Sequence, residues 1–227
     1  MTNNSNKEVA AAPGTHEEVI RLLLTYQPKL KGLEILDLPC GQGSFTRRLL
    51  GLSASVVASD LVLHQRFLTE SNVFHPANAN GPLPFQDHCF DVAISIEGIE
   101  HFENPSFFLR ELYRILRPRG LAIVSTPNVN SLWSRWELFR RGYHSHFQPT
   151  SASKKMSGHQ LPIDATFFRG ASESAGFQLI EVSVSDSNRK SNCWEWVRPR
   201  LMKRLPEWIR NSPLAYGEVS IYVLQKI

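Results

Sequence analysis

A loop of small residues between two apolar segments constrains the fold of this chain more than any other feature. The loop reads Asp37-Leu38-Pro39-Cys40-Gly41-Gln42-Gly43. The apolar run at residues 33–38 predicts a buried strand, and residues 44–50 predict a helix. Glycine lets the backbone of such a turn approach a ligand closely, and the first turn of the helix offers unpaired N–H groups. The pattern therefore predicts a binding site at a strand-to-helix turn.

Asp60 indicates the kind of ligand. It ends the next apolar run, residues 55–60, which predicts a second strand. A carboxylate at the end of that strand is placed to accept hydrogen bonds from both ribose hydroxyls of a nucleoside. The loop is neither a G-x-G-x-x-G dinucleotide fingerprint nor a P-loop, because it lacks that glycine spacing and a Gly-Lys-Ser/Thr sequence.

The rest of the chain alternates apolar runs with amphipathic segments. Thr15 and Glu18 resemble a capping box at the start of a first helix, and Asn104 followed by Pro105 predicts the start of another. Continuous apolar strands that alternate with helices indicate a parallel sheet covered on both faces. We expect further strands at 92–96, 121–125, 177–184 and 217–227, and helices at about 15–28, 105–116 and 164–175.

Composition and charge exclude several classes of protein. Hydrophobic residues make up 42% of the 227-residue chain, and no apolar run approaches the roughly 18 residues that a membrane-spanning helix needs. The polar N-terminus predicts no secretory signal, and three well-separated cysteines favour neither a disulfide framework nor structural zinc. A net charge of +4 argues against nucleic acid as a partner. We expect a cytoplasmic chain with a flexible tail at residues 1–14 and one domain over residues 15–227.

The loop resembles motif I of the class I S-adenosylmethionine-dependent methyltransferases, written D-x-G-x-G-x-G. More landmarks of this family, in its type 11/23-like branch, follow in order, and the resemblance covers about residues 15–184. They are Leu83-Pro84-Phe85, Phe90-Asp91-Val92, Glu100-His101 and Leu116–Leu121. The resemblance implies an α/β fold, Rossmann-like, with a mostly parallel seven-stranded sheet, helices on both faces and an antiparallel last strand.

The resemblance implies S-adenosylmethionine as the cofactor and a role for each residue of the loop. Asp37 would lie near the methionine end of the cofactor. Gly41 and Gly43 would let the chain pass under the ribose and the methionine, while Pro39 takes the first glycine position of the motif. Asp60 would bind the ribose hydroxyls.

Three residues on later segments complete the implied cofactor site. Asn78 stands where the family often has an aspartate that binds the adenine amino group. The amide oxygen of Asn78 can still accept that hydrogen bond, without the charge. The backbone near Ser95 and Ile96 would hold the methionine ammonium group.

His101 is the candidate catalytic residue. An oxygen nucleophile needs a group that removes its proton, and histidine has a pKa near neutral. His101 follows the carboxyl end of the strand expected at 92–96, the edge of an open parallel sheet where ligands bind. The expected reaction is methyl transfer to an oxygen of a small molecule, a sugar or a lipid-linked glycan. The alternative role for His101 is structural, as a cap or brace of the helix that follows.

Two other functions fit parts of the pattern. Glu97, Glu100 and His101 could hold a divalent cation if a later histidine such as His144 or His146 joined them, which resembles the metal site of small-RNA 2′-O-methyltransferases. We expect no metal, because a Glu-His pair at this place also occurs in metal-independent relatives. Binding of an RNA substrate would require a more strongly basic groove than a net charge of +4 implies. The other alternative is a catalytically inactive, cofactor-binding partner subunit.

Two further segments are candidates for contact with the acceptor and with a membrane. Residues 125–135 and His159-Gln160-Leu161-Pro162 resemble a branch of the family associated with glycan and lipid modification. This resemblance implies that residues 126–162 cover the acceptor site. A basic, Trp-rich insertion is expected at 189–210. Within it, residues 194–210 carry five basic and two acidic side chains, which favours peripheral contact with an anionic membrane. In both segments the alternative is ordinary packing against the sheet. The candidate substrate-binding residues are Trp133, His144, His146 and His159.

Overall fold

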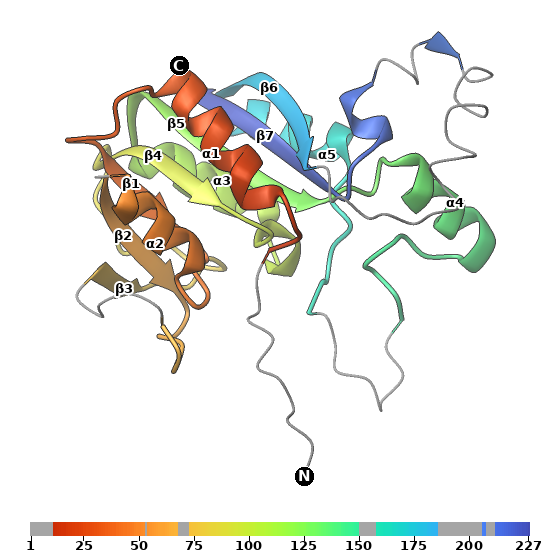
Figure 1. The fold of residues 1–227 in the computed structure, drawn as a ribbon, viewed down its shortest axis with the longest axis horizontal. Helices are drawn as coiled ribbons and strands as arrows, with labels where there is room; N and C mark the ends of the chain where they lie inside the picture. Colours follow the sequence, from red (N-terminus) through yellow and green to blue (C-terminus); the bar gives the residue numbers. More distant parts are fainter. Residues whose placement is uncertain (1–10, 53, 68–72, 150–157, 186–205, 208–211) are drawn as a thin grey trace.

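The fold is a seven-stranded sheet with helices on both faces (Figure 1). The computed structural model describes residues 11–52, 54–67, 73–149, 158–185, 206–207 and 212–227. The strand order is β3-β2-β1-β4-β5-β7-β6, and β7 runs opposite to the other six described strands, antiparallel to both β5 and β6. The strands are β1 (Glu34–Asp37), β2 (Ser55–Asp60), β3 (Phe74–Pro76), β4 (Phe90–Ser95), β5 (Leu116–Pro127), β6 (Phe177–Ser185) and β7 (Val219–Lys226).

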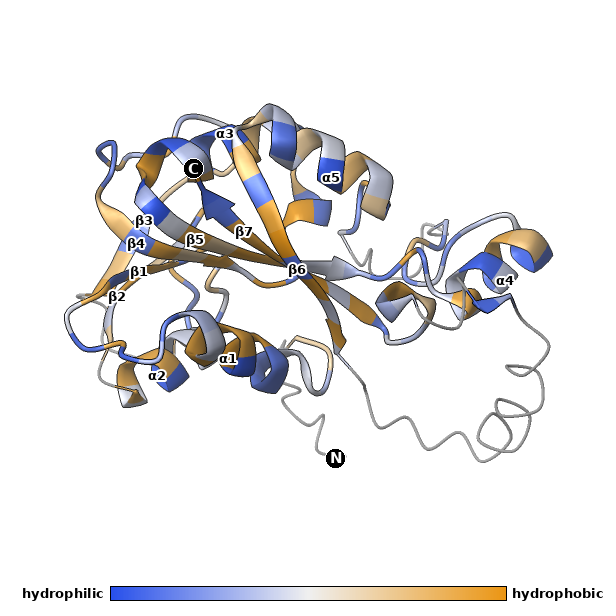
Figure 2. Ribbon diagram, turned by 90° about the horizontal axis from the view of Figure 1, so that it is seen from above, coloured by the Kyte–Doolittle hydropathy of each residue, from blue (hydrophilic) through white to orange (hydrophobic). Residues whose placement is uncertain are grey.

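The helices form two layers because each presents one apolar stripe to the sheet (Figure 2). α1 (Thr15–Tyr26) and α2 (Ser44–Gly51) pack on one face with Val19, Leu23 and Leu49 buried. α3 (Pro105–Ile115) and α5 (Ala165–Ser174) pack on the other face around Phe108 and Phe168. α4 (Leu132–Arg141) lies to one side of these layers (Figure 2). Two short 3-10 helices, η2 (Ile99–His101) and η3 (Pro213–Ala215), complete the described elements.

Side-chain caps begin α3, α4 and α5, whereas α1 and α2 each follow a glycine. The Asn104 side chain accepts a hydrogen bond from Phe107 N at 2.9 Å, so the predicted cap of α3 is confirmed. The predicted capping box of α1 is wrong: its N-cap is Gly14, and the Thr15 hydroxyl lies 3.5 Å from Glu97 Oε1 instead. Ala12 N also donates to Glu97, at 2.8 Å, so the chain is bonded to the domain three residues before the expected boundary at 15.

Two strands differ from the sequence-based expectation. β3 was not expected, because its three residues include a proline and show no periodicity. β5 begins at Leu116, directly after α3, rather than at 121, and its pairing with β4 shifts register between Phe90 and Val92. The added residues pair at the amino end of β5, far from the edge that carries the site.

Parts of the chain fall outside the described residues. They include residues 1–10 of the expected tail and all but residues 206 and 207 of the expected membrane-contacting segment 194–210. Among the described residues, none of the helices combines the length and the apolarity that crossing a membrane requires.

Candidate active site

The glycine loop lies between β1 and α2, at the carboxyl edge of the sheet. Gly41 and Gly43 have φ angles of 52° and 79°, in the left-handed region that side chains rarely adopt. The loop is tied to β2 by a hydrogen bond from Cys40 N to Ser59 O at 2.8 Å. Around the Cβ position that Gly41 lacks there is open space to 4 Å. At Gly41 the loop therefore leaves its backbone uncovered, which a close approach by a ligand requires.

Asp60 ends β2 beside this loop. Its carboxylate accepts hydrogen bonds from Gly41 N at 2.9 Å and from Leu61 N at 2.7 Å. Each carboxylate oxygen has further lone pairs, so two acceptor positions remain in a part of the site that is only half-buried. The backbone bonds fix the orientation of the carboxylate, as a site for two ribose hydroxyls requires.

Asp37 lies beneath the loop and is buried. Its Oδ2 accepts a hydrogen bond from the Thr46 hydroxyl of α2 at 2.6 Å. Burial, with the charge of Asp60 adding to it, raises the pKa of Asp37 to about 7. Asp37 thus ties β1 to α2 and shapes the loop from below; Thr46, the partner that holds it, carried no motif signal in the sequence.

Pro39 packs against the loop that follows β4. A Cβ on Gly98 would lie 2.3 Å from Pro39 Cδ and 3.2 Å from Ser95 Oγ, so only a glycine fits there. The contact joins the glycine loop to the segment that carries Glu100 and His101. On the other side of the loop, the Phe67 ring packs on Gly43, where an added Cβ would lie 2.7 Å from it. Neither Gly98 nor Phe67 had a sequence signal, because both act through contacts distant along the chain.

The three remaining cofactor candidates lie in different environments. Asn78 is exposed, and its side-chain oxygen accepts a hydrogen bond from Asn80 N at 3.0 Å, in a local turn. Ser95, at the end of β4, is buried, and its hydroxyl has no hydrogen-bond partner among the described residues. Ile96 is half-buried and packs against the core beneath α1.

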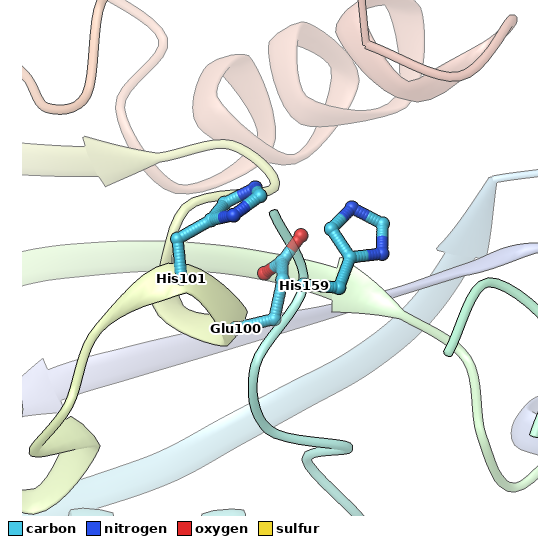
Figure 3. A group of neighbouring side chains, drawn as sticks. All are labelled: Glu100, His101 and His159. Carbon is cyan, nitrogen blue, oxygen red and sulfur yellow. The ribbon is translucent and has the colours of Figure 1, made fainter. Parts of the chain in front are cut away.

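Glu100, His101 and His159 converge beyond the carboxyl end of β4 (Figure 3). One potential ligand atom from each lies within 4.8 Å of the others. Two hydrogen bonds, from Gln160 N at 2.9 Å and Leu161 N at 3.1 Å to Glu100 O, hold the later segment on η2. The two imidazole rings meet edge to face with their centroids 4.9 Å apart. The predicted catalytic residue and one predicted acceptor residue are therefore neighbours.

The other residues considered for a metal or an acceptor lie outside this group. Glu97 turns toward the segment before α1, where its Oε1 accepts from Ala12 N, so the alternative metal cluster of Glu97, Glu100 and His101 is not formed among the described residues. His144 Nδ1 instead lies 3.0 Å from the Ser134 hydroxyl. The carbonyl of His146 lies 3.0 Å from His159 Nδ1, and Trp133 is 43% exposed on α4.

Comparison with known proteins decides the family. A family model described as a methyltransferase domain matches residues 11–182, most of the chain. The chain belongs to the class I S-adenosylmethionine-dependent methyltransferases. A rat mitochondrial ubiquinone biosynthesis O-methyltransferase is 29% identical over 133 residues, which cover 53% of this chain and 39% of the relative. A malonyl-[acyl-carrier protein] O-methyltransferase of Pectobacterium atrosepticum is 29% identical over 60% of this chain and 61% of its own length.

Solved methyltransferases share the fold. A methyltransferase of Archaeoglobus fulgidus superposes with a TM-score of 0.62 at 18% identity, covering 94% of this chain and 95% of that one. One from Mesorhizobium loti gives 0.60 at 18% identity, over 94% and 99% of the two chains. The matched segments span less than two thirds of the curated relatives described above.

The residues of this methyltransferase domain fit the cofactor of the family. The bare backbone at Gly41, the fixed carboxylate of Asp60 and the buried hydroxyl of Ser95, which has no partner among the described residues, lie along the same sheet edge. Asp60 would hold the ribose, and the loop backbone would pass beneath the ribose and methionine. The Asn78 amide is the weaker fit, because its oxygen is already engaged by Asn80 N.

Proposed function

We propose that this protein transfers a methyl group from S-adenosylmethionine to an oxygen of a small molecule, a sugar or a lipid-linked glycan. The observation that carries the proposal is the contact between Pro39 and Gly98. Through this contact the segment that carries Glu100 and His101 packs beside the glycine loop. Relatives named as a ubiquinone biosynthesis O-methyltransferase and a malonyl-[acyl-carrier protein] O-methyltransferase support an oxygen acceptor.

The chain supplies positioning and proton removal. The bound cofactor provides a methyl group on a cationic sulfur, which is already activated for transfer, so alignment accounts for much of the rate enhancement. As the methyl forms its bond to the acceptor oxygen, the bond electrons stay on sulfur and the hydroxyl proton must leave. The groups gathered for this task are Glu100, His101 and His159.

His101 is the central residue of this group. Its Nδ1 lies 2.8 Å from the carbonyl oxygen of Gly158, which can only accept, so Nδ1 carries the hydrogen. Nε2 then holds the free lone pair. We infer that removal of the acceptor proton depends on Nε2 of His101.

Methyl-transfer screening tests this function. The purified chain would be incubated with isotopically labelled S-adenosylmethionine and with sugars, phenols, carboxylic acids and RNA, and methylated products would be identified by mass spectrometry. Label on an oxygen of a small acceptor is the expected result. Label on RNA alone, or no transfer despite tight cofactor binding, would overturn the proposal.

His101→Ala tests the role of this residue once an acceptor is found. We expect the rate of the chemical step to fall by about a hundredfold or more while cofactor affinity is unchanged. His75→Ala is the matched control, because His75 lies on exposed strand β3. A mutant that keeps the wild-type rate would return His101 to a structural role.

A further inference from the structure

We propose that Glu100, His101 and His159 form a binding site for one divalent transition-metal ion. The ligand set is two imidazoles and one carboxylate, from η2 and from the segment before α5 (Figure 3). The set differs from the E-x-x-E-H motif, because Glu97 is engaged elsewhere and His159 takes its place. The site stands on these residues alone; its catalytic consequence rests on the proposed O-methyl transfer.

Both histidines are oriented as metal ligands are. His101 Nδ1 lies 2.8 Å from Gly158 O, and His159 Nδ1 lies 3.0 Å from His146 O. A backbone carbonyl only accepts hydrogen bonds, so each Nδ1 carries the hydrogen and each Nε2 keeps its lone pair. Histidines that bind metal usually donate their other ring N–H in this way, which fixes the tautomer and the ring.

Glu100 supplies the second, independent observation. Its side chain is fully buried, and neither carboxylate oxygen has a hydrogen-bond partner among the described residues. A buried polar group without a partner is costly. A bound cation would stabilise the Glu100 carboxylate, because the carboxylate oxygens can donate lone pairs to it and its positive charge offsets theirs.

The ligand set selects the class of ion. Two imidazoles with one carboxylate suit Zn²⁺, Co²⁺ and related ions, whereas Mg²⁺ and Ca²⁺ prefer all-oxygen sites. Bonds of about 2.1 Å place two ligand atoms at most about 4.2 Å apart, so binding would draw the three groups slightly together. Three protein ligands leave a coordination position open.

The open coordination position would give the metal ion a role in the proposed methyl transfer. An acceptor hydroxyl that occupies it becomes more acidic, because the cation stabilises the oxyanion, and its proton passes to solvent. His101 then acts as a ligand through Nε2, which accounts for the dependence of the reaction on that atom. The two roles of His101 are exclusive, since both use the same lone pair.

Titration of the metal-free chain with CoCl₂ tests the site directly. Cobalt held by nitrogen and oxygen ligands gives visible absorption bands, and binding through a cysteine would add an intense near-ultraviolet band. We expect one Co²⁺ per chain without the thiolate band, displacement by Zn²⁺, and no displacement by Mg²⁺. His159→Ala and Glu100→Gln should each weaken Co²⁺ binding at least tenfold.

Matched controls keep the test specific. Glu97→Gln removes a carboxylate from the same loop, and His144→Ala removes an imidazole from outside the group; both should bind Co²⁺ as the wild type does. Each variant would first be shown to unfold at a temperature close to that of the metal-free wild type. If the wild type binds no Co²⁺, or if His159→Ala and Glu100→Gln bind it normally, the site does not exist.

Metal binding and activity separate the two proposals. If the EDTA-treated chain transfers methyl groups at the full rate, the cation is not used and His101 acts as a simple base, so the proposed function stands without this inference. If the chain binds Co²⁺ through these residues but methylates no oxygen acceptor, the site stands and the proposed function fails.

Discussion

At the scale of single residues, Asp60 should decide the affinity for the cofactor. Asp60→Ala removes a charged acceptor that is already oriented by Gly41 N and Leu61 N. A hydrogen bond to a charged group contributes roughly 1.5–3 kcal/mol, so S-adenosylhomocysteine should bind at least tenfold more weakly. Calorimetry would measure this, with the exposed Asp87 as the control position for the same substitution. Unchanged affinity in a folded Asp60→Ala variant would refute the ribose assignment.

Asp37 makes the stability of the cofactor-free protein depend on pH. Its folded-state pKa is raised to about 7, so between pH 4 and pH 7 the folded protein binds more protons at this site than the unfolded chain does. The free energy of unfolding should therefore fall as pH rises through that window. Each pKa unit corresponds to about 1.4 kcal/mol, which gives an upper limit of about 4 kcal/mol for this shift.

Asp37→Asn tests that dependence. The amide oxygen still accepts the hydrogen bond from Thr46, while the charge is gone. We expect the variant to be more stable than the wild type at pH 8 and equally stable near pH 4, by urea unfolding at each pH. Parallel stability curves for the two proteins would show that Asp37 does not titrate in this range.

At the scale of elements, the turn between β4 and η2 is packed too tightly for any side chain. Gly98→Ala would place a Cβ 2.3 Å from Pro39 Cδ, so the glycine loop or the η2 segment must move. The backbone φ of Gly98 is −119°, which alanine adopts freely, so the effect is steric alone. We expect a loss of 1–3 kcal/mol in stability, as overpacking costs, together with weaker cofactor binding.

Gly170→Ala is the control for this steric effect. Gly170 lies in α5 with open space to 4 Å around its missing Cβ. Alanine in a helix interior is favoured over glycine by roughly 0.5–1 kcal/mol, so this variant should gain stability. Thermal unfolding and calorimetry with S-adenosylhomocysteine would compare both proteins. Normal cofactor affinity in Gly98→Ala would show that the two loops are not coupled.

The elements that the sequence predicted correctly are those whose signal is local. β1, β2 and β4 are continuous apolar runs, and α3 has both its cap and its stripe within a few residues. β3 had no such signal, because its three residues are held by pairing with β2, a segment distant along the chain, and by a hydrogen bond from the Ser59 hydroxyl to His75 O. The capping box failed because Thr15 turns to Glu97, a contact across 82 residues that outweighs a local preference.

At the scale of the whole molecule, the candidate site combines segments that are distant along the chain. The motifs predicted the glycine loop, Asp60 and the Glu100-His101 pair, because each lies at the carboxyl end of a predicted strand. The pairing with His159 could not be predicted. It depends on the packing of residues 160 and 161 against η2, where their N–H groups donate hydrogen bonds to Glu100 O. A motif gives the residues of one segment, but the partner segment is known only from the fold.

Positive charge is concentrated in one segment of the chain, and this concentration predicts binding to anionic membranes. Residues 194–210, most of which lie outside the described part, hold five of the 25 Lys and Arg residues and two acidic ones. Each Lys or Arg near an anionic surface contributes about 1 kcal/mol, so the protein should sediment with anionic but not neutral vesicles. Binding should weaken as salt rises, because salt screens the attraction.

A charge-matched pair of variants tests this prediction. Replacing Arg200, Lys203 and Arg204 by glutamate should abolish sedimentation and leave cofactor affinity unchanged. The control variant reverses Lys29, Lys31 and Arg169, three exposed positions elsewhere, with the same change in net charge. Equal loss in both variants would mean that net charge, rather than this segment, binds the vesicles.

The contact between Pro39 and Gly98 also restricts how this sequence can diverge. The proline ring fills the volume that a side chain at position 98 would need. Substitutions at the two positions should therefore be correlated: glycine at 39 would remove the clash between the ring and a side chain at 98, whereas proline at 39 maintains it. In a lineage that changes both positions, the order of the two changes is fixed, since alanine at 98 is tolerated only after the ring has gone.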